Sequence, residues 1–251
     1  MYGTRGRIGL IALATDTAVL PDFSRLMPQG VAVYQTLIGL PRGEVSAAAL
    51  AEMLADDRLE RAAELLRWLD VDLIVFACTT GSLIHGPGWD STLTARIERA
   101  SGKQATTTST AVLDGLRALG ATTLAIATPY NDELNARERV FLDASGFRVA
   151  AIAGLGCAAD PDIGRLGPDD AIALVERVDS PAADAIFISC TNFDCLPAVE
   201  PLERRLGKPV ITSNLAGGWA ALRRIGVDDA VADYGRLLAL PLPRPMEALV
   251  P

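Results

Sequence analysis

An internal repeat constrains the fold of this chain more than any other feature of its sequence. The segment DLIVFACTT, from Asp72 to Thr80, returns later in the chain as DAIFISCTN, from Asp184 to Asn192. The spacing between the two copies is far longer than the roughly 20 to 50 residues that separate the units of solenoid repeats. The repeat therefore predicts two similar halves related by a pseudo-two-fold axis.

A second pair of segments supports the duplication. A Gly-Lys pair, a short apolar run and a helical stretch follow one another twice, from Gly102 to Gly120 and from Gly207 to Gly226. The matched blocks occur in the same order in both parts of the chain. We therefore divide the chain into a first half (1–118), a second half (119–226) and a C-terminal segment (227–251) that packs back on the core.

Short apolar runs alternate with helical patterns along the whole chain. Apolar residues at helical spacing predict a helix over 59–69. Gly146 ends a second helical stretch that begins near Asp132, and Pro168 and Asp169 begin a third that runs to about Val178. Runs rich in Val, Ile and Ala predict buried strands at 7–14, 72–77, 104–108, 123–128, 147–153, 184–189 and 208–213. This alternation is typical of an α/β fold with mostly parallel sheets, and we expect the active site in the cleft between the two halves.

Composition excludes several classes of partner. The formal net charge is -8, and Lys and Arg are scattered, so a nucleic-acid partner is not expected. No apolar run reaches the roughly 20 residues of a membrane-spanning helix, and we expect a cytoplasmic protein that forms a homodimer or homotetramer. Four cysteines and one histidine supply neither a disulfide scaffold nor a metal site. The segment Gly154-Leu155-Gly156 does not match a dinucleotide fingerprint, so no cofactor is expected.

The duplicated cysteines, Cys78 and Cys190, are the candidate catalytic residues. Each follows a predicted strand, and ligands of parallel sheets bind beyond the carboxyl ends of the strands. Two thiols facing each other can remove a proton on one side of a planar intermediate and return it on the other. Alternatively, one thiolate adds to an activated double bond and the other thiol manages the proton.

Either role requires a thiol pKa below the usual value of about 8.5. After each cysteine come residues that can begin a helix, whose free backbone N–H groups would bind a carboxylate. Hydrogen bonds from Thr79, Thr80, Thr191 and Asn192 could provide this lowering of the pKa, although the sequence alone does not establish it, and the same donors are the natural site for an enolate oxygen. Cys157 and Cys195 are interpreted as packing residues, and His85 as incidental.

These motifs resemble those of the aspartate/glutamate racemase superfamily, in the branch with maleate cis-trans isomerases, arylmalonate decarboxylases and ectoine-utilisation proteins. The resemblance covers residues 7–226. It is carried by RIGLI from Arg7, ACTTGS from Ala77, Thr128-Pro129-Tyr130, SCTN from Ser189 and KPVITSN from Lys208.

The resemblance implies a cofactor-free enzyme acting on a small carboxylate or amino-acid-like substrate. In maleate isomerases the cysteine matching Cys78 looks like the nucleophile and the one matching Cys190 the proton donor. The tyrosine matching Tyr130 helps to hold a substrate carboxylate. Where those enzymes carry asparagines, this chain has Asp16 and Asp160, and a carboxylate there would repel maleate and attract an ammonium group.

Two other functions stay open. Arylmalonate decarboxylases keep only the second cysteine, so Cys190 alone would reprotonate the product; the presence of Cys78 counts against that reaction. A ligand-binding protein that kept the cleft without turnover is the third interpretation. The leading one is a cofactor-independent isomerase or racemase that uses both cysteines.

Overall fold

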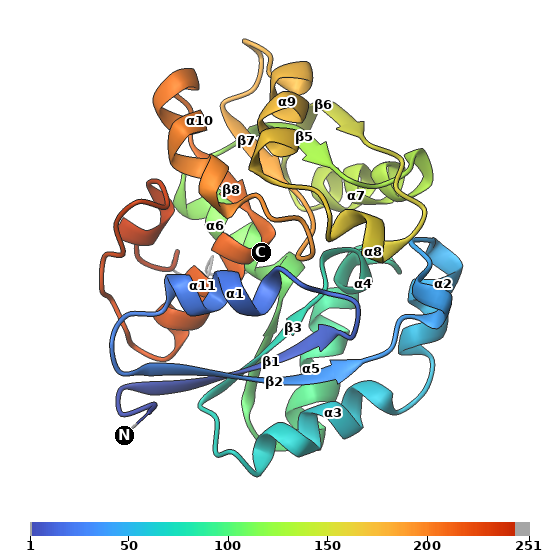
Figure 1. The fold of residues 1–251 in the computed structure, drawn as a ribbon, viewed down its shortest axis with the longest axis vertical. Coiled ribbons are helices and arrows are strands. Elements are labelled where there is room, and N and C mark those ends of the chain that lie inside the picture. Colours follow the sequence, from blue (N-terminus) through green and yellow to red (C-terminus); the bar gives the residue numbers. More distant parts are fainter. Residues whose placement is uncertain (1, 244–251) are drawn as a thin grey trace, which may run out of the picture.

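Two four-stranded parallel sheets form the centre of the molecule. The computed structural model describes residues 2–243, and Figure 1 shows the two sheets in separate lobes surrounded by helices. The strand orders are β2-β1-β3-β4 and β6-β5-β7-β8, and every pairing within them is parallel. Each strand of the first sheet has a counterpart at the same place in the second. The expected α/β fold of two pseudo-two-fold-related halves is confirmed.

The strands are β1 (Gly6–Leu13), β2 (Val31–Ile38), β3 (Leu73–Ala77), β4 (Gln104–Thr107), β5 (Thr123–Thr128), β6 (Arg148–Gly154), β7 (Ala185–Ile188) and β8 (Val210–Thr212). The helices are α1 (Val19–Leu26), α2 (Ala47–Leu54), α3 (Arg58–Arg67), α4 (Thr79–Leu83), α5 (Trp89–Ser101), α6 (Thr108–Ala118), α7 (Asp132–Ala144), α8 (Asp160–Ile163), α9 (Pro168–Val178), α10 (Val199–Leu206) and α11 (Ser213–Arg224).

Strand β2 is the strand that the sequence interpretation missed. It lies at the edge of the first sheet and pairs only with β1. Most of its side chains are half-buried, so it lacks the continuous burial of β1 or β3. An edge strand with one open side does not need a uniformly apolar sequence, and its pattern is correspondingly weak.

The repeated aspartates have the same structural task in both halves. The Asp72 carboxylate accepts a hydrogen bond from the backbone N–H of Arg7, at the start of β1, at 2.8 Å. The Asp184 carboxylate accepts one from Thr123, at the start of β5, at 3.0 Å. Each aspartate thus fixes the beginning of the neighbouring central strand.

The repeated Gly-Lys pairs also correspond in space. Gly102 ends α5 and Gly207 ends α10, with φ of 68° and 71°, a left-handed conformation that glycine adopts without a steric penalty. The lysines that follow them both form an ion pair: Lys103 with Asp70 at 2.6 Å and Lys208 with Asp179 at 2.7 Å. Each lysine ties the turn before its strand to another loop of the same half.

Helices cover both sheets, and two of them join the halves. In the first half, α3 and α5 pack on one face, and α1 and α11 on the other. In the second, α9 and α10 pack on one face, and α7 lies against β6 on the other. Helices α6 and α11 pack against each other between the sheets, and each contacts strands of both halves. This pairing closes the cleft from one side.

The segment after α11 folds back on that helix. Trp219 and Arg223 both donate hydrogen bonds to the carbonyl of Leu240, at 2.8 and 2.9 Å, and Leu237 and Leu238 are buried. Residues 244–251 lie outside the described residues. The division of the chain into two halves and a C-terminal segment, after residues 118 and 226, stays a proposal. Within residues 2–243 no helix is long and apolar enough to cross a membrane.

Candidate active site

The first cysteine lies at the junction of β3 and α4. Cys78 is the N-cap of α4, and its Sγ accepts a hydrogen bond from the backbone N–H of Gly81 at 3.3 Å. A Cβ atom at Gly81 would lie 2.9 Å from this sulfur, closer than a side chain can approach. Glycine is therefore needed at this position for the amide to reach the thiol.

The second cysteine follows β7 but has a different backbone. Cys190 has φ of 111°, a conformation that costs a non-glycine residue free energy and is found mostly at functional sites. No helix begins after it: residues 191–195 form a turn and an irregular segment that leads into a 3-10 helix at Leu196–Ala198. The expectation of a helix start after Cys190 is wrong, because the turn brings Asn192 back towards the first half.

Both cysteines line one cavity between the two halves. Its walls are Leu13, Leu40, Val45, Leu50, Cys78, Thr79, Thr80, Tyr130, Asp160, Cys190 and Thr191. The cavity volume is about 20 Å³, room for roughly one water molecule. Seven of the nine residues predicted for the site therefore lie together, and the cavity is covered by apolar side chains that the sequence interpretation did not name.

The cover comes from the segment after β2. Glu44 forms an isolated antiparallel bridge with Ala159, and the N–H of Val45 donates to the carbonyl of Ala158 at 2.9 Å. Asn131 donates to the carbonyl of Val45 at 3.3 Å. This segment of the first half is thus held to two loops of the second half, and it places Leu40 and Val45 over the thiols.

Ser213, which the sequence interpretation did not select, joins the two cysteine loops. Its Oγ accepts a hydrogen bond from the backbone N–H of Cys190 at 3.0 Å and another from the Thr79 hydroxyl at 2.8 Å. All of these groups are buried. The available signal was its place as the last residue of the predicted strand 208–213, in the segment Thr212-Ser213-Asn214.

Asp16 and Asn192 lie behind the cavity wall. Asp16 Oδ1 accepts hydrogen bonds from the N–H groups of Ala18 and Val19 at the start of α1, at 3.0 and 2.9 Å. Asp16 Oδ2 is buried and accepts no hydrogen bond from the described residues. Burial raises the pKa of Asp16 to about 6, and the nearby Asp160 adds to the rise.

Asp160 is in the cavity wall itself. Its Oδ2 accepts hydrogen bonds from Thr15 and from the Asn192 side chain, the latter at 3.1 Å. Burial raises the pKa of Asp160 above its usual value, and these two donors oppose the rise. Asn192 thus acts here as a support for Asp160. Asp16 and Asp160, two carboxyl groups with raised pKa values, thus both lie near the two thiols.

The thiols are not activated by their surroundings. Burial raises the pKa of Cys78 to about 12, and Asp160 and Asp16 raise it further, against a lowering by the Gly81 N–H. Burial likewise raises the pKa of Cys190 well above its usual value, and Asp160 adds to the rise. The lowering of the thiol pKa values that either role requires is not found in this structure, because burial and two carboxyl groups outweigh the few donors. Both cysteines are neutral thiols at pH 7.

Tyr130 completes the polar wall on the side of the second half. Burial raises the pKa of its hydroxyl well above the usual value, and the nearby Cys190 thiol and Ser189 hydroxyl also influence it. A neutral phenol donates one hydrogen bond. It is therefore a suitable donor to an oxygen atom of a bound molecule.

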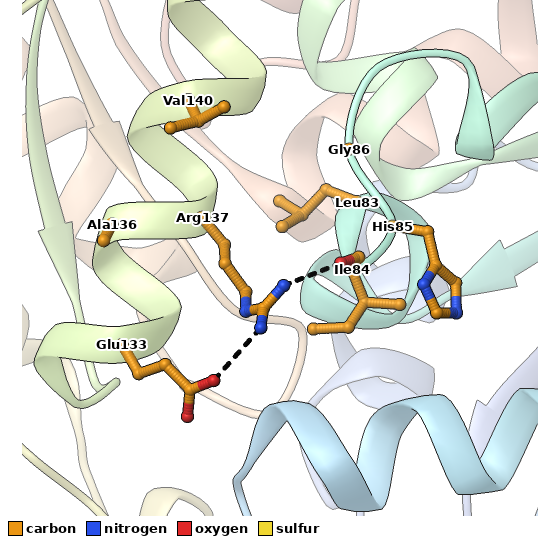
Figure 2. Close-up of a pocket in the computed structure, with 8 residues that line it drawn as sticks. All are labelled: Leu83, Ile84, His85, Gly86, Glu133, Ala136, Arg137 and Val140. Carbon is orange, nitrogen blue, oxygen red and sulfur yellow. Dashed lines mark hydrogen bonds and ion pairs between the residues drawn. The ribbon is translucent and has the colours of Figure 1, made fainter.

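A wider pocket lies on the outside of the molecule. Figure 2 shows that α7 residues Glu133, Arg137 and Val140 face His85 and its neighbours across it. Its volume is about 590 Å³, but neither cysteine of the repeat lines it. His85 belongs to this pocket and packs edge-on against Trp89. Cys157 and Cys195 line neither pocket. Within residues 2–243 no three His, Cys, Asp or Glu side chains are grouped as a metal site.

Fold and cavity together define a class: duplicated α/β proteins with two buried thiols, and polar donors around them, in a cavity between the halves. The sequence profile of the arylmalonate decarboxylase family matches residues 8–238. The chain belongs to this family, and the resemblance to the maleate isomerase and arylmalonate decarboxylase branch is confirmed.

Individual relatives carry two different names. Arylmalonate decarboxylase of Bordetella bronchiseptica is 37% identical over 162 residues, which are 63% of this chain and 68% of that protein. Maleate isomerase of Nocardia farcinica is 29% identical over 240 residues, or 92% and 95% of the two chains. A solved cysteine-to-serine variant of the Nocardia farcinica maleate cis-trans isomerase, with a covalently bound succinylcysteine intermediate, superposes with a TM-score of 0.87 at 27% identity and covers 93% of this chain and 98% of that one.

Proposed function

We propose that the chain is a cofactor-independent isomerase or racemase that acts on a small carboxylate through Cys78 and Cys190. The observation that carries this proposal is the shared cavity, which both thiols line together with Thr79, Thr80 and Tyr130. Relatives named as maleate isomerases and as a decarboxylase support an enzyme of this chemistry. Two sulfur atoms in one cavity favour the two-thiol reactions over decarboxylation.

The neutral state of the thiols decides how such a reaction begins. A thiol donates a proton directly, but proton removal or addition to a double bond requires a thiolate. In a racemase, one sulfur takes the proton from carbon and the other thiol returns a proton to the opposite face. In an isomerase, the Cys78 thiolate adds to one alkene carbon while the Cys190 thiol gives a proton to the other. The resulting carbon–carbon single bond rotates, and Cys190 then takes the proton back as the carbon–sulfur bond breaks.

Substrate binding itself can supply the activation. The carboxyl groups of Asp16 and Asp160 both raise the pKa of Cys78 and Cys190. An ammonium group on the substrate would pair with these carboxylates and cancel their effect, because opposite charges in a buried site attract strongly. No Lys, Arg or His lies among the cavity-lining residues within the described chain. An amino-acid-like carboxylate therefore fits this cavity better than a dicarboxylate such as maleate.

The cavity must open before any such substrate binds. Ligand pockets typically have volumes of roughly 300 Å³ or more, against about 20 Å³ here. Leu40 and Val45 lie on a segment that is held to the second half by a few backbone hydrogen bonds. Their displacement is the simplest route to the thiols, and their return would exclude water from the reaction.

Incubation with small carboxylates in deuterated water tests the proposed chemistry. We expect racemisation of an amino acid with one deuterium incorporated at the α-carbon, or conversion of maleate to fumarate, read by NMR and mass spectrometry. Decarboxylation would instead release carbon dioxide and leave deuterium at the reprotonated carbon. Ligand binding with no labelled product would support the ligand-binding alternative and contradict the proposal.

Asp16→Asn tests the preference for an ammonium group. Asparagine also caps helices well, so the start of α1 is retained while the charge is lost. We expect kcat/KM for amino acids to fall about a hundredfold, the effect of removing one buried charge partner. Activity towards maleate, measured in parallel, is expected to stay equal or rise. An equal fall for both substrates would show that Asp16 supports the fold and does not select the substrate.

Decarboxylation of a substituted malonate is the second candidate. The family match and the 37% identity to arylmalonate decarboxylase favour it. The apolar side chains of Leu40, Val45 and Leu50 on one side of the cavity also suit an aryl group. In this reaction Cys190 alone would return the proton to the carbon that loses carbon dioxide.

A further inference from the structure

A buried carboxyl group that the proposed chemistry does not use lies directly behind Tyr130. Glu138, on α7, has no exposed surface. Its Oε1 accepts a hydrogen bond from the Ser189 hydroxyl at 2.6 Å, while Oε2 is buried without a hydrogen-bond partner among the described residues. An unpaired buried carboxylate oxygen costs free energy, and a site that keeps one requires an explanation.

Ser189 connects this carboxyl group to the cavity. It immediately precedes Cys190, and the Tyr130 hydroxyl lies close enough to both the Ser189 hydroxyl and the Cys190 thiol for these groups to shift its pKa. Glu138, Ser189, Tyr130 and the cavity therefore form a continuous series of polar groups. Hydroxyl groups both donate and accept hydrogen bonds. The group at the end of such a series therefore decides in which direction each hydroxyl donates.

We propose that Glu138 is a positioning residue whose protonation state, passed on through Ser189, decides whether the Tyr130 hydroxyl donates a hydrogen bond into the cavity. When Glu138 is ionised, Ser189 donates to it, and Tyr130 then donates to Ser189 and not to the cavity. When Glu138 is protonated, it donates to Ser189, Ser189 can donate to Tyr130, and the phenol hydrogen is free for a bound carboxylate. Binding of a carboxylate would then be coupled to proton uptake by Glu138.

The surroundings of Glu138 suit a group that changes protonation near neutral pH. A small internal cavity beside it is lined by Thr79, Leu83, Ser109, Val112, Phe141, Leu142 and Phe187, from α4, α6, α7 and β7. None of these side chains is charged, and the titratable Tyr130 lies close enough to Glu138 for this carboxyl group to raise its pKa. Burial raises the pKa of Glu138 to about 7, and the Ser189 hydrogen bond opposes this.

Alkylation of Cys190 tests the coupling without requiring turnover. The proposal shares one premise with the proposed function, namely that a carboxylate binds in the cavity. In a Cys78→Ser background, peptide mapping would give the rates at which iodoacetate and the neutral iodoacetamide alkylate Cys190 between about pH 6.5 and 9. The ratio of the two rates cancels the thiolate fraction and reports how well the cavity receives a carboxylate.

We expect the ratio to fall about tenfold as Glu138 ionises, the effect of losing one hydrogen bond to a charged group. In Glu138→Gln the fall should disappear, because glutamine cannot ionise. Asp16 and Asp160 also face Cys190 and repel iodoacetate. The Cys78→Ser protein is therefore compared at each pH with the same protein that also carries Glu138→Gln. An unchanged fall in Glu138→Gln would overturn the proposal.

Two further variants separate the hydrogen-bond series from simple charge repulsion. Ser189→Ala keeps the Glu138 charge but breaks the series, and should also abolish the fall across this pH range. A fall that survives Ser189→Ala, even at a higher pH, would overturn the proposal in favour of repulsion through space. Asp22→Asn is the matched control: Asp22 is also buried, has a pKa raised to about 7 by burial and is held by Asn214 at 2.8 Å, yet it has no contact with this series. The fall should persist in it.

Discussion

Replacing Cys190 with serine is expected to lower turnover by about 10⁴-fold, the upper range of what a positioned acid or base contributes. Serine has nearly the same size and keeps the hydrogen-bonding neighbours of Cys190, but its hydroxyl is a far weaker acid. The Cys78 sulfur can still react in this variant. With an alkene substrate, a covalent adduct should therefore accumulate on Cys78.

Mass spectrometry of the Cys190→Ser protein after incubation with maleate checks this result. A mass increase equal to the substrate, located on the peptide that contains Cys78, is the expected finding. Cys157→Ser serves as the control, since Cys157 is outside the cavity lining, and it should keep its activity. Full activity of Cys190→Ser or Cys190→Ala would contradict a role for this thiol. With an amino acid, the variant should exchange the α-hydrogen of one enantiomer without inverting it.

Cys78→Gly is expected to remove isomerase or racemase activity to a similar extent, about 10⁴-fold. The reason for the loss differs from that in Cys190→Ser. This change removes the sulfur that adds to the alkene in an isomerase, or that exchanges a proton with one face of the α-carbon in a racemase. It also removes the sulfur atom that accepts a hydrogen bond from the backbone N–H of Gly81. Polarimetry or chiral chromatography for amino acids, and ultraviolet absorbance for maleate, measure the loss.

The same variant separates the two candidate reactions. If Cys78→Gly releases carbon dioxide from an arylmalonate such as phenylmalonate as fast as the unmodified chain, Cys190 alone carries out the chemistry and the protein is a decarboxylase. We expect instead that the unmodified chain is slow in this reaction. Cys78→Ser, which keeps a polar group of similar size, shows whether any loss in Cys78→Gly comes from the altered start of α4.

The main features of the fold could be predicted because they depend on local patterns and on the repeat. Continuous apolar runs identified the central strands β1, β3, β5 and β7, and Pro168 marked the first residue of α9. The repeat placed both cysteines at strand ends, and the shared cavity of Cys78 and Cys190 agrees with that interpretation. Strand β2 was missed, since an edge strand with half-buried side chains has no strong apolar pattern.

Side-chain environments could not be predicted in the same way. The two cysteine motifs are similar in sequence, yet Cys78 caps a helix while Cys190 has a positive φ and is followed by a turn. Ser213 and Glu138 lie far from both motifs in the chain, and only folding brings them against Cys190 and Ser189. A local pattern contains no information on such distant partners.

Local sequence patterns were enough to predict two matching α/β halves with a cysteine after a central strand in each. They were not enough to predict that these thiols are buried, that Asp16 and Asp160 lie beside them, or that their pKa values rise. Strand formation depends on neighbouring residues, whereas a pKa depends on the loss of water and on charges that folding brings close.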